Sequence, residues 1–215
     1  EFRDHRYKDI SLKKSIKRSL RRNHERLQVD DLMAYERHAK NEMEIIYAID
    51  ASGSMKGEKL TITKKAGIAL AYEAREDKVG LIIFNSKIER VIPPTKDFMR
   101  LVKGLSHIQA QKETDIPRMV DKAIETFSAR KCSKHLIIIS DAMPTIGENP
   151  KKDTLQAVSK ARAAGIKVSL VGIRLGKKGK RLAERIANVG EGRHYLVESL
   201  DEMDKIVLRE YFTMS

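Results

Sequence analysis

Cysteine is nearly absent from this sequence, and long apolar runs are missing altogether. Cys132 is the one cysteine among 215 residues, which excludes an intrachain disulfide and favours a reducing compartment. No apolar run reaches the roughly 18 residues that a membrane span needs, and the amino terminus has no signal-peptide pattern. We therefore expect a cytoplasmic protein with no membrane span. Because Cys132 directly precedes an apolar strand, we expect it to be a small buried hydrophobe.

Aromatic residues and zinc-type ligands are scarce as well. Aromatic residues make up 5% of the chain and tryptophan is missing, so few side chains could stack on the bases of a nucleic acid. The six histidines show no metal-ligand spacing, which argues against a zinc site. The sequence also lacks a phosphate-binding loop, a Ser-His-Asp arrangement and a Gly-x-Ser-x-Gly elbow. The basic segment 176–180 has the wrong spacing for such a loop and predicts a solvated turn.

Acidic charge is in the minority, with 30 Asp and Glu against 43 Lys and Arg and a net charge of +13. Residues 1–26 hold ten basic and four acidic residues. Charge of this density favours an acidic partner such as nucleic acid, an anionic membrane or an acidic protein face, although it also fits the solvated face of a docking helix. Leu12, Ile16 and Leu20 recur at helical spacing and predict a short amphipathic helix over residues 11–22.

The chain is predicted to divide into a basic amino-terminal extension, residues 1–41, and one domain, residues 42–215. Because it begins with Glu1 instead of methionine, we expect a piece of a longer protein. Apolar strands alternate with helical patterns throughout the second part. We predict strands at residues 45–49, 79–84, 87–92, 136–139, 168–173 and 195–197, and helices at residues 60–74, 98–101, 114–129, 154–164, 182–189 and 203–211.

Uniformly apolar strands are buried on both faces, and the helices between them make right-handed crossovers. The alternation therefore predicts an α/β fold, a doubly wound and mostly parallel sheet with helices on both faces. Asn85 and Ser86 predict a hairpin turn, and the two following prolines, Pro93 and Pro94, the end of its edge strand. Gly104 is predicted to end the helix that starts at Phe98.

Two of the apolar strands end in an aspartate, Asp50 and Asp141. Sheets of this kind bind ligands at the carboxyl ends of their strands, and a carboxylate after a buried strand is costly unless something compensates it. Ser52 and Ser54 follow the first aspartate, with Gly53 between them expected to take an unusual backbone angle, and Thr114 at the start of a later helix could add a third hydroxyl. Hard oxygen ligands of this kind suit Mg²⁺ or Mn²⁺. The alternative is that Ser52 or Ser54 caps the next helix.

Three segments, residues 50–55, 114–116 and 139–142, resemble the parts of the metal-ion-dependent adhesion site of von Willebrand factor A (VWA) domains. The resemblance covers about residues 43–211. It implies a Rossmann-like, six-stranded sheet of order 3-2-1-4-5-6. It also implies that Ser52, Ser54 and Thr114 ligate the metal, while Asp50 and Asp141 act directly or through waters. One departure is Lys112-Glu113 where the family often has two glycines, so Glu113 could occupy or shield the site.

The resemblance implies a divalent-metal-dependent protein-interaction module without enzyme activity, in which Mg²⁺ or Mn²⁺ holds a Glu or Asp carboxylate of a partner. Two alternatives stay open. The first is a nucleic-acid-associated VWA domain, Ku-like or Ro-like, with weak and non-specific binding. The second is a Mg²⁺-dependent phosphohydrolase, although those enzymes favour an aspartate where Ser52 stands. Residues 9–21 are also similar to the stretch that often precedes the VWA domain in partners of MoxR-type AAA+ ATPases and in magnesium-chelatase D subunits, which implies an AAA+ ATPase as partner.

Overall fold

The computed structural model describes residues 28, 43–73, 77–106, 108, 110 and 113–199. The chain divides into two units, residues 1–41 and residues 42–215, and the second unit holds the fold described below. The helices predicted over residues 11–22 and 203–211 lie outside the described residues. No helix among the described residues is both long and apolar enough to cross a membrane.

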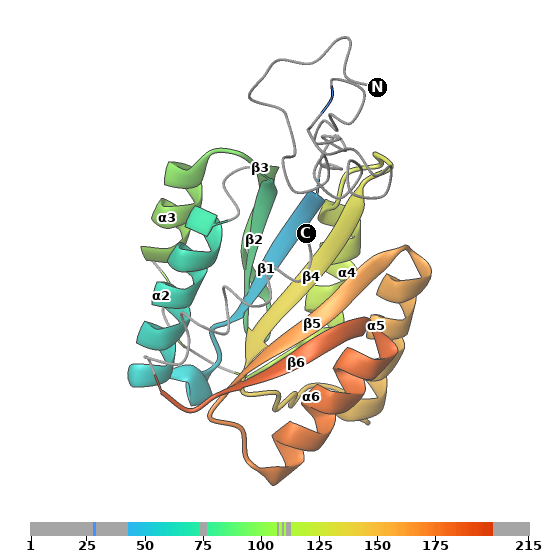
Figure 1. Cartoon of the computed structure of the whole chain (residues 1–215). Helices are drawn as coiled ribbons and strands as arrows, with labels where there is room; N and C mark the ends of the chain where they lie inside the picture. Colours follow the sequence, from blue (N-terminus) through green and yellow to red (C-terminus); the bar gives the residue numbers. More distant parts are fainter. Residues whose placement is uncertain are drawn as a thin grey trace. The chain divides into compact units, whose positions relative to one another are not determined.

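Six strands form one sheet in the order β3-β2-β1-β4-β5-β6 (Figure 1). This is the predicted order, and every neighbouring pair is parallel except β2 and β3, which pair antiparallel through the predicted hairpin. The central strands are buried along nearly their whole length, as their apolar sequences predicted. The strands are β1 (Met43–Asp50), β2 (Lys78–Phe84), β3 (Ile88–Thr95), β4 (Ser133–Ser140), β5 (Ile166–Ile173) and β6 (Glu191–Val197).

Helices cover both faces of the sheet (Figure 1). One core joins α2 and α3 to the side chains of Ile45, Tyr47 and Ile49, and the other joins α4, α5 and α6 to the intervening residues Ile46 and Ala48. Successive side chains of a strand point to opposite faces, so β1 takes part in both cores. The helices are α2 (Glu58–Glu73), α3 (Phe98–Ser106), α4 (Ile116–Thr126), α5 (Pro150–Ala163) and α6 (Lys177–Val189), with a short 3-10 turn, η3 (Gly53–Met55), before α2.

Five local predictions were wrong. Strand β3 continues through Pro93 and Pro94 to Thr95, because an edge strand tolerates residues without an N–H group. Helix α3 continues past Gly104 to Ser106. A Cβ at Gly104 would lie 2.8 Å from the side chain of Ile92, so this glycine allows α3 to approach the sheet closely. The basic segment 176–180 is not a turn, since it forms the amino end of α6.

The fourth concerns Cys132, which is half-buried in the loop before β4 and not a core residue. The expected backbone angle at Gly53 was also misplaced. Among the described glycines, the positive φ angle nearest the site belongs to Gly57, at 75°, immediately before α2. The turn that redirects the chain into α2 therefore lies four residues later than the sequence suggested.

Candidate functional site

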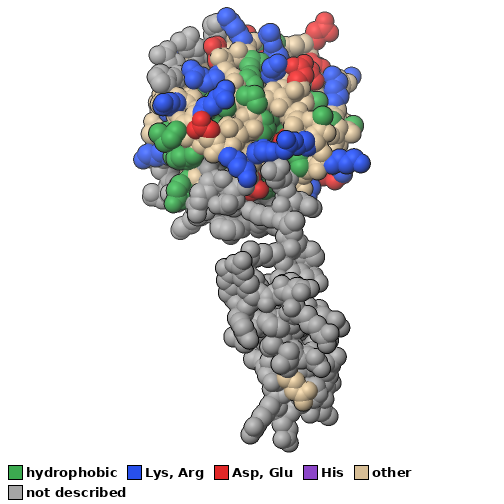
Figure 2. Space-filling view, turned by 90° about the horizontal axis from the view of Figure 1, so that it is seen from above, with side chains coloured by type: hydrophobic (Ala, Val, Ile, Leu, Met, Phe, Trp, Pro, Cys, Tyr) green, Lys and Arg blue, Asp and Glu red, His purple; other side chains and the backbone are tan. Residues whose placement is uncertain are grey.

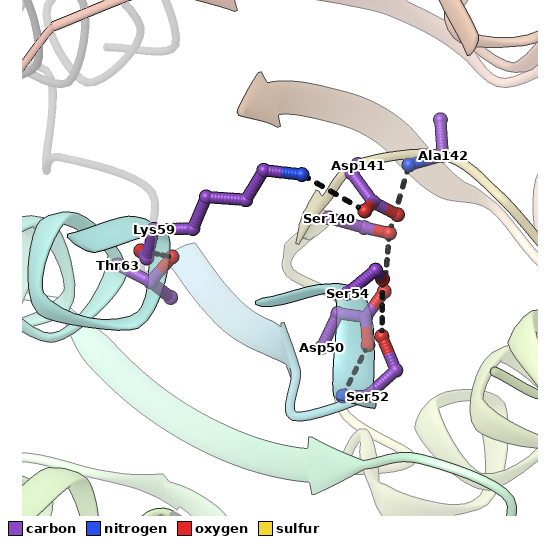
Figure 3. A network of polar contacts seen from close by, with 8 residues as sticks. All are labelled: Asp50, Ser52, Ser54, Lys59, Thr63, Ser140, Asp141 and Ala142. Atoms are coloured by element: carbon purple, nitrogen blue, oxygen red, sulfur yellow. Dashed lines mark hydrogen bonds and ion pairs between the residues drawn. The ribbon is translucent and has the colours of Figure 1, made fainter. Parts of the chain in front are cut away.

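The carboxylate of Asp50, the last residue of β1, is fully buried and held at both oxygens. Its Oδ1 accepts a hydrogen bond from the backbone N–H of Ser52 at 2.8 Å, and its Oδ2 accepts one from the hydroxyl of Ser140 at 2.5 Å (Figure 3). Ser140 is the last residue of the neighbouring strand β4. Because β1 and β4 are parallel neighbours, their carboxyl ends meet at one edge of the sheet, where the sequence placed the site.

The hydroxyls of Ser52 and Ser54 lie 3.1 Å apart and point toward the same network (Figure 3). Ser52 is buried and Ser54 is exposed. Ser52 stands at the N-cap position of η3, yet its side chain makes no capping hydrogen bond. The capping alternative therefore does not account for Ser52, and its hydroxyl is directed to the site instead.

Asp141 follows β4 and brings the second carboxylate to this edge. Its Oδ2 accepts a hydrogen bond from the ammonium of Lys59 at 3.1 Å (Figure 3). Its Oδ1 is buried and accepts no hydrogen bond from any residue that the structure describes. The next residue, Ala142, has a positive φ of 53° and donates its N–H to the Ser140 hydroxyl at 3.0 Å. A non-glycine residue in this conformation is uncommon, and here it turns the chain directly after the carboxylate.

Thr114 is buried in the loop before α4, beside the same edge. Its backbone N–H donates to the hydroxyl of Thr145 at 3.0 Å, and its carbonyl accepts from the Thr145 N–H at 3.0 Å. The following N–H, of Asp115, donates to the carbonyl of Asn85, just beyond β2. These bonds fix the Thr114 loop between the loops that follow β2 and β4. Among the described residues, no hydrogen bond joins its hydroxyl to the four other candidate ligands.

The structure thus brings Asp50, Ser52, Ser54 and Asp141 into one network, with Thr114 in the adjacent loop. Glu113, which could have shielded the site, is exposed. Burial raises the pKa of Asp50 from 3.8 to about 6, and the neighbouring charge of Asp141 adds to the rise, although hydrogen bonds from Ser140 and Ser52 oppose it. A buried carboxylate beside a second carboxylate is an environment that a bound cation would stabilise.

The residues fit a hard divalent cation. Two carboxylates and three hydroxyls are oxygen ligands of the kind that Mg²⁺ and Mn²⁺ take, and the buried Oδ1 of Asp141 offers an acceptor without a donor. No cluster of three or more His, Cys, Asp or Glu residues able to hold a metal occurs in the described ranges. A metal here would therefore depend on the hydroxyls as well as the carboxylates.

Two functional contacts were missed from the sequence. Ser140 was noted only as the neighbour of Asp141, yet its hydroxyl links Asp50 to the backbone of Ala142. Lys59 was not singled out at all. One signal could have found it: it stands in the first turn of α2, and the amino end of a helix disfavours cations, so a lysine there is expected to have a compensating partner.

Comparison with known proteins gives a match to one family model over part of the chain and a shared fold. Residues 45–144 match the family model of the von Willebrand factor type A domain. The chain is 21% identical over 190 residues to the uncharacterized protein YfbK of Escherichia coli K12, across 84% of this chain and 33% of YfbK. It therefore spans about a third of the length of that relative.

Solved structures share the fold at low sequence identity. BatB from Bacteroides thetaiotaomicron superposes with a TM-score of 0.69 at 23% identity, covering 80% of this chain and 98% of BatB. An aerotolerance-related membrane protein from Bacteroides fragilis superposes with a TM-score of 0.67 at 20% identity, covering 80% of this chain and 99% of that protein. The pilus adhesin SpaC from Lactobacillus rhamnosus GG gives 0.70 at 14% identity, covering 80% of this chain and 30% of SpaC. At these identities the likeness concerns the fold alone.

Proposed function

We propose that this chain, whose residues 45–144 match the family model of the von Willebrand factor type A domain, is an interaction module that binds a partner protein through a divalent cation. Mg²⁺ or Mn²⁺ would be held by Asp50, Ser52, Ser54, Thr114 and Asp141. The observation that carries the proposal is the buried Oδ1 of Asp141, which accepts no hydrogen bond from any described residue. It lies close enough to the buried carboxylate of Asp50 for the charge of Asp141 to raise the pKa of Asp50.

The cation would supply a positive charge with a coordination position left for a carboxylate of the partner. Two carboxylates and three hydroxyls supply at most five oxygen ligands, so an octahedral ion keeps a coordination position that a Glu or Asp of a partner can take. We infer binding without catalysis, since the two described histidines, His135 and His194, do not belong to the network at Asp50 and so offer it no general base. The chain's own residues would hold the cation and exclude water from one side of it.

The first test is titration calorimetry of the full chain with Mn²⁺ and Mg²⁺ after removal of metals with EDTA. We expect saturable binding in the millimolar to micromolar range that Asp50→Ala abolishes. Asp121→Ala is the matched control, because it removes a carboxylate that is 52% exposed on α4 and pairs with Lys160. Absence of any metal-dependent heat from the wild-type protein at millimolar Mn²⁺ would contradict the proposal.

The second test concerns the carboxylate of the partner. A fluorescent glutamate-rich peptide should bind the wild-type chain in Mg²⁺, lose binding in EDTA, and fail to bind Asp50→Ala in either buffer. Peptide binding that is the same in Mg²⁺ and in EDTA would instead reflect the net charge of +13 and not the metal. Metal-dependent hydrolysis of a generic phosphoester that Asp50→Asn abolishes would favour the phosphohydrolase alternative.

We propose further that the partner is an AAA+ ATPase of the MoxR type or one of its clients. The support is the similarity of residues 9–21 to the stretch that precedes the VWA domain in such systems, and this segment lies outside the described residues. A pulldown with the full chain, in Mg²⁺ and in EDTA, tests it. Retention of an AAA+ ATPase only in Mg²⁺, and its loss in Asp50→Ala, is the expected result.

The nucleic-acid alternative receives little support from the face of the molecule that Figure 2 shows. Lys and Arg side chains are spread over the face shown in Figure 2, with Asp and Glu side chains among them, and they do not gather into one stripe. A continuous basic stripe is the usual electrostatic footprint of a nucleic-acid-binding domain. Because aromatic residues make up only 5% of the chain and tryptophan is missing, few side chains can stack on bases, so binding to nucleic acid should be weak and should fall steeply as salt is raised. Nanomolar, sequence-selective binding at physiological salt would overturn this interpretation.

A further inference from the structure

Lys59 forms the most buried ion pair among the described residues. Its side chain is 23% exposed and that of Asp141 is 6% exposed, whereas every other described pair has both partners at least 39% exposed. An exposed ion pair contributes little because water screens it. A pair with a nearly buried carboxylate is screened less than an exposed pair, and the Lys59 ammonium is the cation that contacts Asp141.

The position of Lys59 is fixed by the local backbone. Gly57, with its positive φ of 75°, turns the chain into α2, and its carbonyl accepts from the Thr61 N–H at 3.2 Å. The carbonyl of Lys59 accepts from the Thr63 hydroxyl at 2.9 Å (Figure 3). The first turn of α2 is therefore held in place, and the lysine side chain extends from it to Asp141 (Figure 3).

That position is unfavourable for a cation on local grounds. The amino end of a helix carries partial positive charge and stabilises anions. An ammonium there needs a compensating partner, and the residue that provides it is separated by 82 positions along the chain. A local cost offset by one distant contact is typical of a functional arrangement.

We propose that Lys59 is an internal cation that competes with the divalent ion for the carboxylate of Asp141. This inference rests on the proposed metal site. A divalent ion bound to either oxygen of Asp141 would lie close to the ammonium, and two cations in a weakly screened environment repel each other strongly. Metal binding would then require Lys59 to withdraw from Asp141, and the strength of the ion pair would set the metal affinity of the domain.

The test compares Mn²⁺ affinities by titration calorimetry for the wild-type chain, Lys59→Met and Lys59→Arg. Removing the charge in Lys59→Met should tighten Mn²⁺ binding about tenfold or more, whereas Lys59→Arg keeps the charge and should stay within about threefold of wild type. Lys65→Met is the matched control, because it removes an exposed lysine from the same helix. Circular dichroism establishes that each variant is folded.

A second measurement reports on Lys59 itself. Acetylation of the wild-type chain by a limiting amine reagent, followed by mass spectrometry, should label Lys59 slowly in EDTA and at least several-fold faster in saturating Mg²⁺, because withdrawal from Asp141 exposes the amine. The labelling of Lys65 should not change.

The outcomes separate this inference from the proposed function. Equal or weaker Mn²⁺ binding by Lys59→Met, with binding by the wild type, overturns the competition and leaves the metal site standing. Weaker binding in that variant would mean that Lys59 orients Asp141 for the metal. No binding by either protein removes the metal site and the competition together. Binding by Lys59→Met alone supports both.

Discussion

Two regions of the sheet each contain a buried serine whose hydroxyl contacts one ionisable side chain, an aspartate in one region and a histidine in the other. At the carboxyl end, the fully buried hydroxyl of Ser140 donates to Asp50 and accepts from a backbone N–H, that of Ala142. Toward the other end, the fully buried hydroxyl of Ser169 pairs with His135 at 2.9 Å and accepts from a backbone N–H, that of Arg193, at 3.0 Å. In each case the hydroxyl of one serine links an ionisable side chain to a backbone N–H group, that of Ala142 or that of Arg193.

The surroundings of the two serines differ in sign. A cavity of about 270 Å³ beside Ser169 is lined by three cationic side chains, Lys134, Lys167 and Arg193, and by one carboxylate, that of Glu191. Burial, together with the charges of Lys167 and Arg193, lowers the pKa of His135 from 6.5 to about 3. At the other end, burial raises the pKa of Asp50 to about 6. Both groups are held toward their neutral forms, Asp50 by burial beside a second carboxylate and His135 by burial beside two cations.

This difference predicts opposite effects of acid on the stability of the fold. The unfolded chain protonates His135 near pH 6.5 and the folded chain only near pH 3, so this group destabilises the fold as the pH falls between those values. The folded chain protonates Asp50 near pH 6 and the unfolded chain near 3.8, so this group adds stability that is complete below 3.8 and lost as the pH rises through 6. Between pH 7 and 4 the two contributions largely offset each other.

The largest expected effect follows from removing His135. In EDTA, the protonation of His135 should lower the unfolding free energy of the wild-type protein by about 3 kcal/mol as the pH falls from 7 to 4. His135→Gln should therefore lose about 3 kcal/mol less than wild type over that interval, whatever its stability at pH 7. Urea unfolding at the two pH values measures this. His194→Gln, which changes an exposed histidine of β6, is the control and should keep the wild-type dependence.

If His135→Gln and wild type lost equal stability on acidification, His135 would be charged in the folded protein. The cationic surroundings of Ser169 would then have no influence on it, and the contrast between the two ends would be wrong.

Removing Asp50 should act in the other direction. Asp50→Asn lacks the carboxyl group whose protonation stabilises the fold in acid. In EDTA its unfolding free energy should therefore fall by about 2 kcal/mol more than that of wild type between pH 7 and pH 4. Saturating Mg²⁺ should make the wild type more acid-sensitive in the same way, because a bound cation keeps the carboxylate ionised. It should leave Asp50→Asn unchanged. Asp121→Asn serves as the control in the same urea titrations, and an acid dependence of Asp50→Asn equal to wild type would contradict the prediction.

The sheet and its order could be predicted from the sequence because they depend on local patterns. Uniformly apolar strands separated by helical segments leave few arrangements once crossovers are right-handed. The aspartates at the carboxyl ends of β1 and β4 were predicted to lie close together because parallel neighbours end at one edge, and Asp50 and Asp141 lie at that edge. The sequence pattern was sufficient for the order of the strands, but not for the ends of β3 and α3 or the start of α6.

Contacts between distant side chains could not be predicted in this way. The bond from Lys59 to Asp141 spans 82 positions and the bond from Thr114 to Thr145 spans 31. Both depend on how loops are arranged around the sheet, and no periodicity in the sequence encodes that arrangement. The positive φ at Gly57 was assigned to Gly53 for a similar reason, since either glycine in the loop could have made the turn.

Ser140, at the carboxyl end of β4, should affect both the stability of the fold and the affinity for a divalent metal. Ser140→Ala removes a donor to a buried carboxylate and the acceptor of the Ala142 N–H, which should cost about 1.5 kcal/mol of unfolding free energy. The pKa of Asp50 should rise further without the hydroxyl, and we expect Mn²⁺ affinity to fall about tenfold. Calorimetry and urea unfolding at pH 7 measure the two effects. Unchanged Mn²⁺ affinity would mean that the hydroxyl of Ser140 does not orient Asp50 for the metal.

The serine at the other end should matter for stability alone. Ser169→Ala removes the acceptor of the Arg193 N–H and the partner of His135, both neutral hydrogen bonds, so we expect a loss of about 1 kcal/mol. Its hydroxyl touches neither Asp50 nor Asp141 in the described structure, so Mn²⁺ affinity should stay within about twofold of wild type. The same two measurements as for Ser140→Ala decide this. A fall in Mn²⁺ affinity as large as that of Ser140→Ala would show that the two ends of the sheet are coupled, because no direct contact could carry the effect.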